Sequence, residues 1–155
     1  MRDVRSVRRG DTRAMTGLPL TGGCACGVVR FELVAAPTKA GYCHCTRCQK
    51  RTGTSQSASA LIAAEHFAVV SDGESLRSWT HPDGGRSKWF CGTCGSHLFS
   101  GSPQEGDTIL VRMSAFDRAP HVEMQIRAFV ADAAPWEPIP DDGIPRFDSM
   151  PPGVL

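Results

Sequence analysis

The chain has 155 residues, of which 41% are hydrophobic and 21% charged, and its formal net charge is +1. This length suits one domain with a single core, and the composition excludes a disordered chain dominated by one charge. The near-zero charge removes the positive field that a nucleic-acid binder uses, so we expect no nucleic-acid partner. No apolar run approaches the roughly 20 residues of a membrane helix, so we expect no membrane partner either.

Residues 1–16 carry five arginines and two aspartates and show no apolar periodicity. They lack the apolar centre of a secretory signal, so we expect a disordered arm on a cytoplasmic protein. A folded domain is expected over residues 17–148, followed by a short tail over residues 149–155.

The predicted elements are short, because the 16 glycines and 11 prolines interrupt the chain too often for long helices. Alternating apolar residues and turn signals predict a mostly β, antiparallel fold. In chain order we expect a strand over 27–33, a helix over 46–51, and strands over 57–62, 67–70, 76–79, 87–91, 96–100, 108–113 and 126–130. A strong turn signal over 81–85 predicts a hairpin.

The last segment, residues 133–155, contains six of the eleven prolines. It should cross the surface as extended coil, with Trp136 and Phe147 as possible anchors. Two earlier tryptophans, Trp79 and Trp89, are expected in the core.

The seven cysteines fall into a CxC, a CxCxxC and a CxxC group. In a reducing compartment such clusters are metal ligands more often than disulfides, and zinc favours closely spaced thiolates followed by a turn. The two paired groups would form one closed four-thiolate zinc site: Cys24, Cys26, Cys91 and Cys94. The remaining trio, Cys43, Cys45 and Cys48, would hold a second zinc with one position open, as catalytic zinc requires.

Other arrangements of the trio stay open at this point. His44 or His97 could supply a fourth ligand and make the site purely structural, or two thiols of the trio could form a redox disulfide. His44 is the weaker ligand, because on an extended backbone it points away from Cys43 and Cys45.

Three cations lie beside the trio: Arg47, Lys50 and Arg51. They suit the carboxylates of an acidic thiol ligand, although a solvated basic edge would have the same sequence. The hydroxyl-rich residues 52–56 could line the same pocket.

The three cysteine motifs resemble those of the glutathione-dependent formaldehyde-activating enzyme and centromere protein V family. The likeness lies in GCACGVVRFE, CHCTRCQKRTG and FCGTCGSHLF, and extends to APW and PRF near the C-terminus. It implies an Mss4-like β fold with a structural zinc on the CxC and CxxC cysteines and a catalytic zinc on the CHCxxC cysteines. One position departs from the family: Arg127 stands where many members have histidine.

The resemblance implies a zinc-dependent carbon-sulfur lyase. The open zinc would bind the sulfur of glutathione, or of a similar small thiol, and present it as thiolate to formaldehyde or a related small aldehyde. The alternative is a zinc-stabilised glutathione carrier or interaction module without catalysis, because a shared scaffold does not fix a shared activity.

Overall fold

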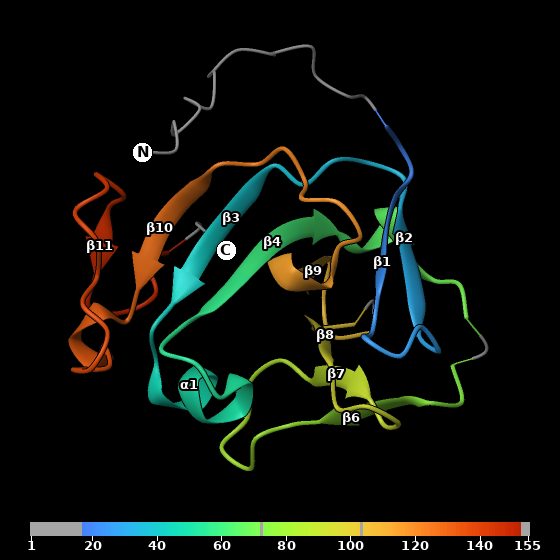
Figure 1. Cartoon of the computed structure of the whole chain (residues 1–155), viewed down its shortest axis with the longest axis horizontal. Helices are drawn as coiled ribbons and strands as arrows, with labels where there is room; N and C mark the ends of the chain where they lie inside the picture. The colour runs from blue at the N-terminus through green and yellow to red at the C-terminus, as the bar shows by residue number, and fades with distance from the viewer. Residues whose placement is uncertain (1–16, 72, 103, 153–155) are drawn as a thin grey trace, which may run out of the picture.

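The computed structural model describes residues 17–71, 73–102 and 104–152 of the chain, and the arm expected over residues 1–16 lies outside them. Within the described part, eleven strands form two sheets. The smaller sheet has the order β1-β2-β5 and the larger one β11-β10-β3-β4-β9-β8-β7-β6. In Figure 1 the larger sheet runs from β11 on the left to β9 near the centre and then downward through β8 and β7 to β6. The mostly β fold is confirmed.

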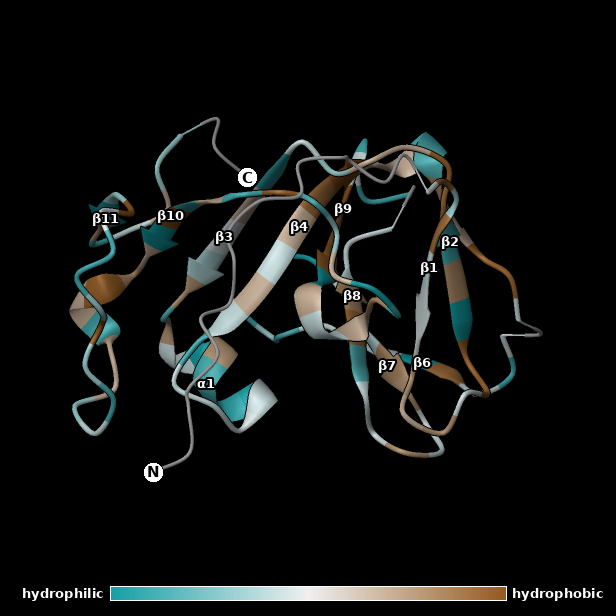
Figure 2. Ribbon diagram, turned by 45° about the horizontal axis from the view of Figure 1, so that its top comes forward, coloured by the Kyte–Doolittle hydropathy of each residue, from teal (hydrophilic) through white to brown (hydrophobic). Residues whose placement is uncertain are grey.

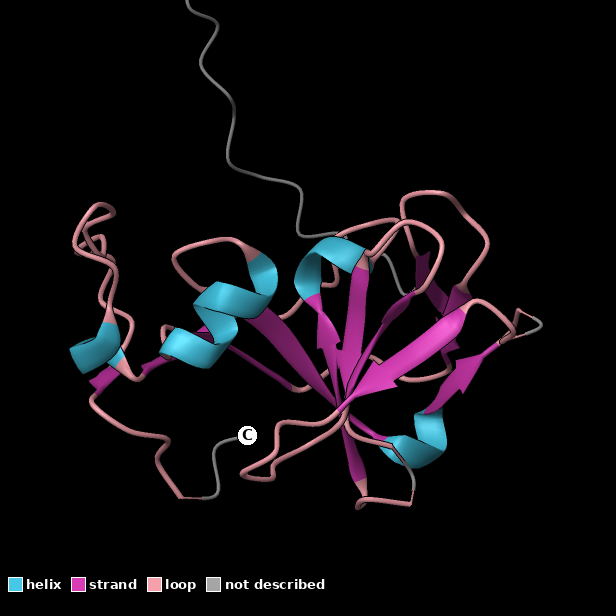
Figure 3. Ribbon diagram, turned by 90° about the horizontal axis from the view of Figure 1, so that it is seen from below, coloured by secondary structure: helices cyan, strands magenta, loops and turns pink. Residues whose placement is uncertain are grey.

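The strands are β1 (Leu20–Gly23), β2 (Arg30–Leu33), β3 (Lys39–Cys43), β4 (Ser57–Ala63), β5 (Phe67–Val69), β6 (Leu76–Trp79), β7 (Lys88–Cys91), β8 (His97–Ser100), β9 (Thr108–Arg112), β10 (Met124–Ala128) and β11 (Arg146–Phe147). The α-helix is α1 (Thr46–Thr52), and the 3-10 turns are η1 (Ala64–His66), η2 (Met113–Ala115) and η3 (Val130–Asp132). Figure 3 shows these helical pieces as short segments around the strands.

Most predicted strands are present, but β1, β3 and β11 were missed. β1 contains two glycines and β3 has a central glycine, so neither shows the β-branched alternation that identifies a strand. Pairing with neighbouring strands stabilises them instead. The antiparallel expectation also needs correction, because β10 pairs in parallel with both β3 and β11.

The core lies between the two sheets. In β2, Phe31 and Leu33 are fully buried while the intervening polar residues are not, and this alternation appears as brown and teal bands in Figure 2. They pack in one cluster with Leu98 of β8 and Val111 of β9. Burying each such side chain contributes about 1.5–3 kcal/mol, so this cluster is what holds the two sheets together.

The small sheet approaches the large one closely at Gly22 of β1. A Cβ atom there would lie 2.3 Å from the carbonyl oxygen of Ala115 in η2. Only glycine allows this contact without moving the backbone. This close approach matters for the candidate metal site, because Cys24 is only two residues further along the chain than Gly22.

The C-terminal segment differs in part from its prediction. Phe147 lies in β11 and pairs with Ala128, but the side chain of Trp136 is 67% exposed and anchors nothing. Among the described residues, no helix has the length and apolar character needed to span a membrane.

Candidate functional site

The first candidate metal site joins the CxC and CxxC cysteines. Cys24 and Cys26 lie in the turn between β1 and β2, Cys91 ends β7, and Cys94 lies in the turn before β8. The four Sγ atoms lie within 4.8 Å of one another, with 3.4 Å between Cys24 and Cys26. Four sulfurs about 2.3 Å from a tetrahedral zinc would be about 3.8 Å apart. The described cysteines are all free thiols, so this geometry fits zinc and not a disulfide.

Two tight turns place these sulfurs. The N–H of Gly27 donates to the carbonyl of Cys24 at 3.0 Å, and the N–H of Gly95 donates to that of Cys91 at 2.8 Å. Both glycines have positive φ, +80° and +76°, which other residues rarely adopt. A hydrogen bond with the hydroxyl of Ser96 lowers the pKa of the Cys94 thiol to about 5, which favours the thiolate that a metal binds.

The second candidate site is the trio at the junction of β3 and α1. Cys43 ends β3, Cys45 caps the N-terminus of α1, and Cys48 lies in its first turn. The N–H of Cys48 donates to Sγ of Cys45 at 3.3 Å, and the sulfurs of Cys48 and Cys43 are 3.5 Å apart. Among the described residues, neither His44 nor His97 joins this group of ligand atoms. A metal held by these three sulfurs would therefore keep one tetrahedral position for an outside ligand.

The thiols of the trio strongly affect one another's protonation. Hydrogen bonds from Cys43 and Cys45 lower the pKa of Cys48 to about 2. The same contacts, with Cys45 and Cys48, raise the pKa of Cys43. Cys48 is therefore the thiol of the trio that ionises first, and its thiolate accepts hydrogen bonds from the neighbouring thiols. Binding a metal would release the protons of Cys43 and Cys45, whose pKa values are raised.

His44 lies between two of these cysteines but turns away from them. Its backbone N–H donates to the carbonyl of Ala128 in β10 at 2.9 Å, and its ring is buried with Nε2 unpartnered among the described residues. Burial lowers its pKa, and the charge of Arg127 lowers it further. The ring of His44 therefore does not join the sulfurs of the trio, and the charges that act on it are those of Arg127 and Glu137.

The trio opens on a cavity of about 710 Å³, here called the sulfur cavity. Cys45 and Cys48 line it, and so do all three predicted cations, Arg47, Lys50 and Arg51. Trp79 also lines it and is 46% exposed, so its expected place in the core is wrong. The prediction for Trp89 is closer, because Trp89 is half-buried and stacks on Phe99 of the core at 5.7 Å.

A second cavity of about 1200 Å³, here called the hydroxyl cavity, lies alongside. The hydroxyl-rich residues 52–56 line this cavity and not the sulfur cavity, so the expectation that they line the same pocket as the trio is wrong. The two cavities share four lining residues: Lys50, Arg51, His97 and Arg112.

The rim of the sulfur cavity, by which we mean Arg47, Lys50, Arg51 and Asp83, carries positively and negatively charged side chains. Arg47 forms an exposed ion pair with Asp83, with 2.9 Å between Nη2 and Oδ2. The guanidinium of Arg51 lies 5.4 Å from the ring centre of Phe90, and its Nε and Nη2 atoms are buried without a hydrogen-bond partner in the described part of the chain. Such unsatisfied donors cost free energy unless a ligand accepts from them.

Three further cations line the sulfur cavity: Arg86, Lys88 and Arg112. Arg86 donates to the carbonyl and the hydroxyl of Thr108, and we call the other two, Lys88 and Arg112, the inner cations. Arg112 is only 8% exposed, and its Nη1 donates to Oγ of Ser59 at 3.0 Å. Burial lowers its pKa, while the negative charge of the trio, from Cys48 above all, opposes that effect. Burial also lowers the pKa of Lys88. No described carboxylate forms an ion pair with either.

The inner cations were not predicted from the sequence, although the pattern of β9 could have indicated Arg112. In the strand sequence TILVR, alternation places Ile109 and Val111 in the core and Arg112 on the opposite face. A charged residue there faces α1 and the cavities. Lys88 gave no comparable signal, because its environment depends on how β7 lies relative to α1.

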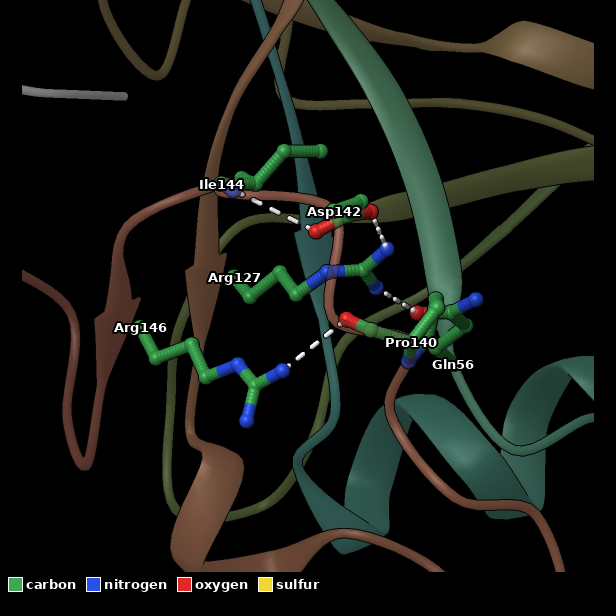
Figure 4. A network of polar contacts seen from close by, with 6 residues as sticks. All are labelled: Gln56, Arg127, Pro140, Asp142, Ile144 and Arg146. Carbon is green, nitrogen blue, oxygen red and sulfur yellow. Dashed lines mark hydrogen bonds and ion pairs between the residues drawn. The ribbon is translucent and has the colours of Figure 1, made fainter.

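Arg127, whose own side chain is buried, forms a network of polar contacts (Figure 4). Its Nη1 donates to Oε1 of Gln56 at 3.1 Å, its Nη2 donates to Oδ2 of Asp142 at 2.6 Å, and its guanidinium lies 4.3 Å from the ring centre of Tyr42. Tyr42 directly precedes Cys43, and Gln56 directly precedes β4. Arg127 therefore fastens the C-terminal segment to the strands that support the trio.

Replacing Arg127 with methionine should destabilise the fold by about 1–3 kcal/mol, because the change removes the two hydrogen bonds that the buried guanidinium donates to Gln56 and Asp142. Urea denaturation measures this loss. Arg146→Met is the matched control, since the exposed Arg146 donates, within the described part of the chain, to the carbonyl of Pro140 alone. Equal losses in the two variants would contradict a special role for Arg127.

His97 should remain neutral at physiological pH. Burial and the positive charges of Arg51 and Arg112 lower its pKa to about 4, so protonation is confined to acid solution. NMR titration of its ring should give a midpoint below pH 5, and Arg112→Gln should raise that midpoint by removing one of the causes. A midpoint above pH 6 in the unmodified chain would refute this environment.

Comparison with known proteins agrees with the motifs. The sequence model of a family described as "Glutathione-dependent formaldehyde-activating enzyme" matches residues 19–132, which include all seven cysteines. A crystal structure of a Rhodobacter sphaeroides protein is similar in fold, with a TM-score of 0.52 and 24% sequence identity. The match covers 63% of this chain and 88% of that one.

Proposed function

Because the chain belongs to the glutathione-dependent formaldehyde-activating enzyme family, we propose that it joins the thiol of glutathione to formaldehyde or a related small aldehyde. The product would be an S-hydroxymethyl adduct, and the enzyme a zinc-dependent carbon-sulfur lyase. One observation above all supports this: three thiols leave a ligand position free, and two of them, Cys45 and Cys48, line a cavity that is also lined by cations.

The donor set supports two zinc ions with different tasks. Cys24, Cys26, Cys91 and Cys94 would close around a structural ion. Cys43, Cys45 and Cys48 would hold the catalytic one. Zinc with an open position lowers the pKa of a thiol that binds there, and so supplies thiolate at neutral pH. We assign both sites to one domain over residues 17–148.

The rim of the sulfur cavity matches the charges of glutathione. Glutathione carries two carboxylates and one ammonium at neutral pH. Lys50 and Arg51 would bind the carboxylates together with Arg47, whose partner Asp83 offers an acceptor to the ammonium. The unpartnered Nε and Nη2 of Arg51 gain acceptors in this arrangement.

The residues of the chain would contribute mainly position and charge. Aldehydes add to thiols unaided, so the gain comes from holding both reactants in one cavity with the thiol already ionised. His97, kept neutral by its surroundings, would remain uncharged at neutral pH, so the thiol proton would leave to solvent.

Adduct formation by the zinc-loaded protein tests the proposal. NMR exchange spectroscopy with glutathione and formaldehyde should show faster adduct formation than the same buffer with zinc alone. Glutathione binding without any acceleration, across several aldehydes, would contradict the enzyme and support a carrier.

A further inference from the structure

The inner cations, Lys88 and Arg112, have no task in binding glutathione as proposed above. They line the sulfur cavity as Cys48 of the trio does, and both lose solvation there. Arg112 is buried and Lys88 half-buried, and neither has a carboxylate partner among the described residues, so only the trio offsets the cost of their charge and a further negative charge nearby would be stabilised.

Addition of a thiol to an aldehyde supplies such a charge. The thiolate sulfur forms a bond to the carbonyl carbon, and the π electron pair of the C=O bond moves to oxygen. The negative charge thereby passes from sulfur to oxygen, and water then protonates the alkoxide while the thiol proton has gone to solvent. No oxidant or reductant is needed. Donors fixed around the oxygen would stabilise this charge where it develops.

We propose that Arg112 and Lys88 form an oxyanion site for the aldehyde oxygen, which rests on the proposed function. The bond from Nη1 to Ser59 fixes the guanidinium of Arg112, and no other hydrogen bond of Arg112 occurs among the described residues. Its remaining donors face the space shared by the two cavities, where an aldehyde held next to the thiol must lie. Lys88 provides the second positive charge from β7.

Kinetics of Arg112→Gln test the site. Loss of one such donor typically lowers kcat by about 100-fold or more. Glutathione affinity, measured separately by isothermal titration calorimetry, should change by less than about threefold, because the donor acts on the aldehyde oxygen. If affinity for glutathione falls as much as kcat, Arg112 serves the thiol and the oxyanion site is overturned.

Variants of Lys88 test the same site independently, in case Arg112→Gln does not fold. Lys88→Gln should lower kcat while Lys88→Arg, which keeps the charge, should retain most of it. Arg118→Gln is the control, because Arg118 is exposed and lines neither cavity. Circular dichroism and zinc content confirm that each variant folds. Equal kcat in Lys88→Gln and Arg118→Gln would overturn the role of Lys88.

Formate offers a readout that does not depend on activity. As a small carboxylate it should occupy the oxyanion site, quench tryptophan fluorescence and compete with formaldehyde but not with glutathione. Its binding should be lost in Arg112→Gln. Failure of the unmodified protein to accelerate the reaction would reject the proposed function, whereas acceleration that survives in Arg112→Gln would reject only the oxyanion site.

Discussion

Replacing Cys91 with serine should unfold the domain or bring it to the edge of unfolding. The side chain of Cys91 is 0% exposed, ends β7 and belongs to the same core cluster as Cys24. A structural zinc contributes on the order of 10 kcal/mol of binding free energy to folding, as much as the whole stability of a typical domain. Loss of one of four thiolates would forfeit most of it and leave a hydroxyl buried in an apolar setting.

Thermal melting followed by circular dichroism measures this effect, with and without a chelator. Thr93→Ser is the matched control, because Thr93 lies in the same turn and its exposed hydroxyl contacts only Ser75. The chelator should lower the melting temperature of the unmodified chain and of the control, but change Cys91→Ser little. A Cys91→Ser variant that melts like the control and keeps two zinc ions would contradict a structural metal.

Replacing Cys45 with serine should abolish catalysis while the fold survives. Cys45 is half-exposed at the N-cap of α1, where its sulfur accepts from the N–H of Cys48. Serine is a good N-cap residue, so the helix should remain. A hydroxyl is a poor zinc ligand, however, so the trio should lose its ion.

The expected result is a fall in bound zinc from two ions to one per chain, with adduct formation at the rate of buffer. Metal analysis and the NMR exchange assay measure the two effects on one sample. Thr46→Ser, at the exposed neighbouring position, should retain both ions and full activity. Full activity in Cys45→Ser would show that the reaction does not need the trio.

The grouping of the cysteines could be predicted from sequence because zinc knuckles are local. The turns after Cys24 and Cys91 depend on glycines only a few residues away, so spacing alone indicates paired ligands. The division into four and three then follows from counting. In the structure, the sulfurs of each group lie within 4.8 Å of one another, as this division requires.

Strands such as β3 could not be predicted, because their stability depends on partners far along the chain. β3 has the sequence KAGYC, and it is extended because β4 and β10 pair with it on both sides. Gly41 within it lies so close to Ile126 that a Cβ atom would come within 2.6 Å of that side chain. This closeness is a property of the sheet and leaves no local pattern.

Some cations of the sulfur cavity could likewise be predicted from their place in the sequence, and others could not. Arg47, Lys50 and Arg51 lie within three residues of Cys48 on α1, so their place at the sulfur cavity could be expected. Lys88 and Arg112 come from β7 and β9 and reach the cavity only through the order of the large sheet.

Titration of the cobalt-substituted protein with glutathione tests most directly whether three thiols hold a metal with a free position. Tetrahedral cobalt coordinated by thiolates absorbs visible light, and its spectrum changes when a ligand is added. We predict two cobalt ions per chain and a spectral change that saturates at one glutathione per chain. Two bound ions whose spectrum glutathione leaves unchanged would mean that both sites are closed, and would contradict the proposed chemistry.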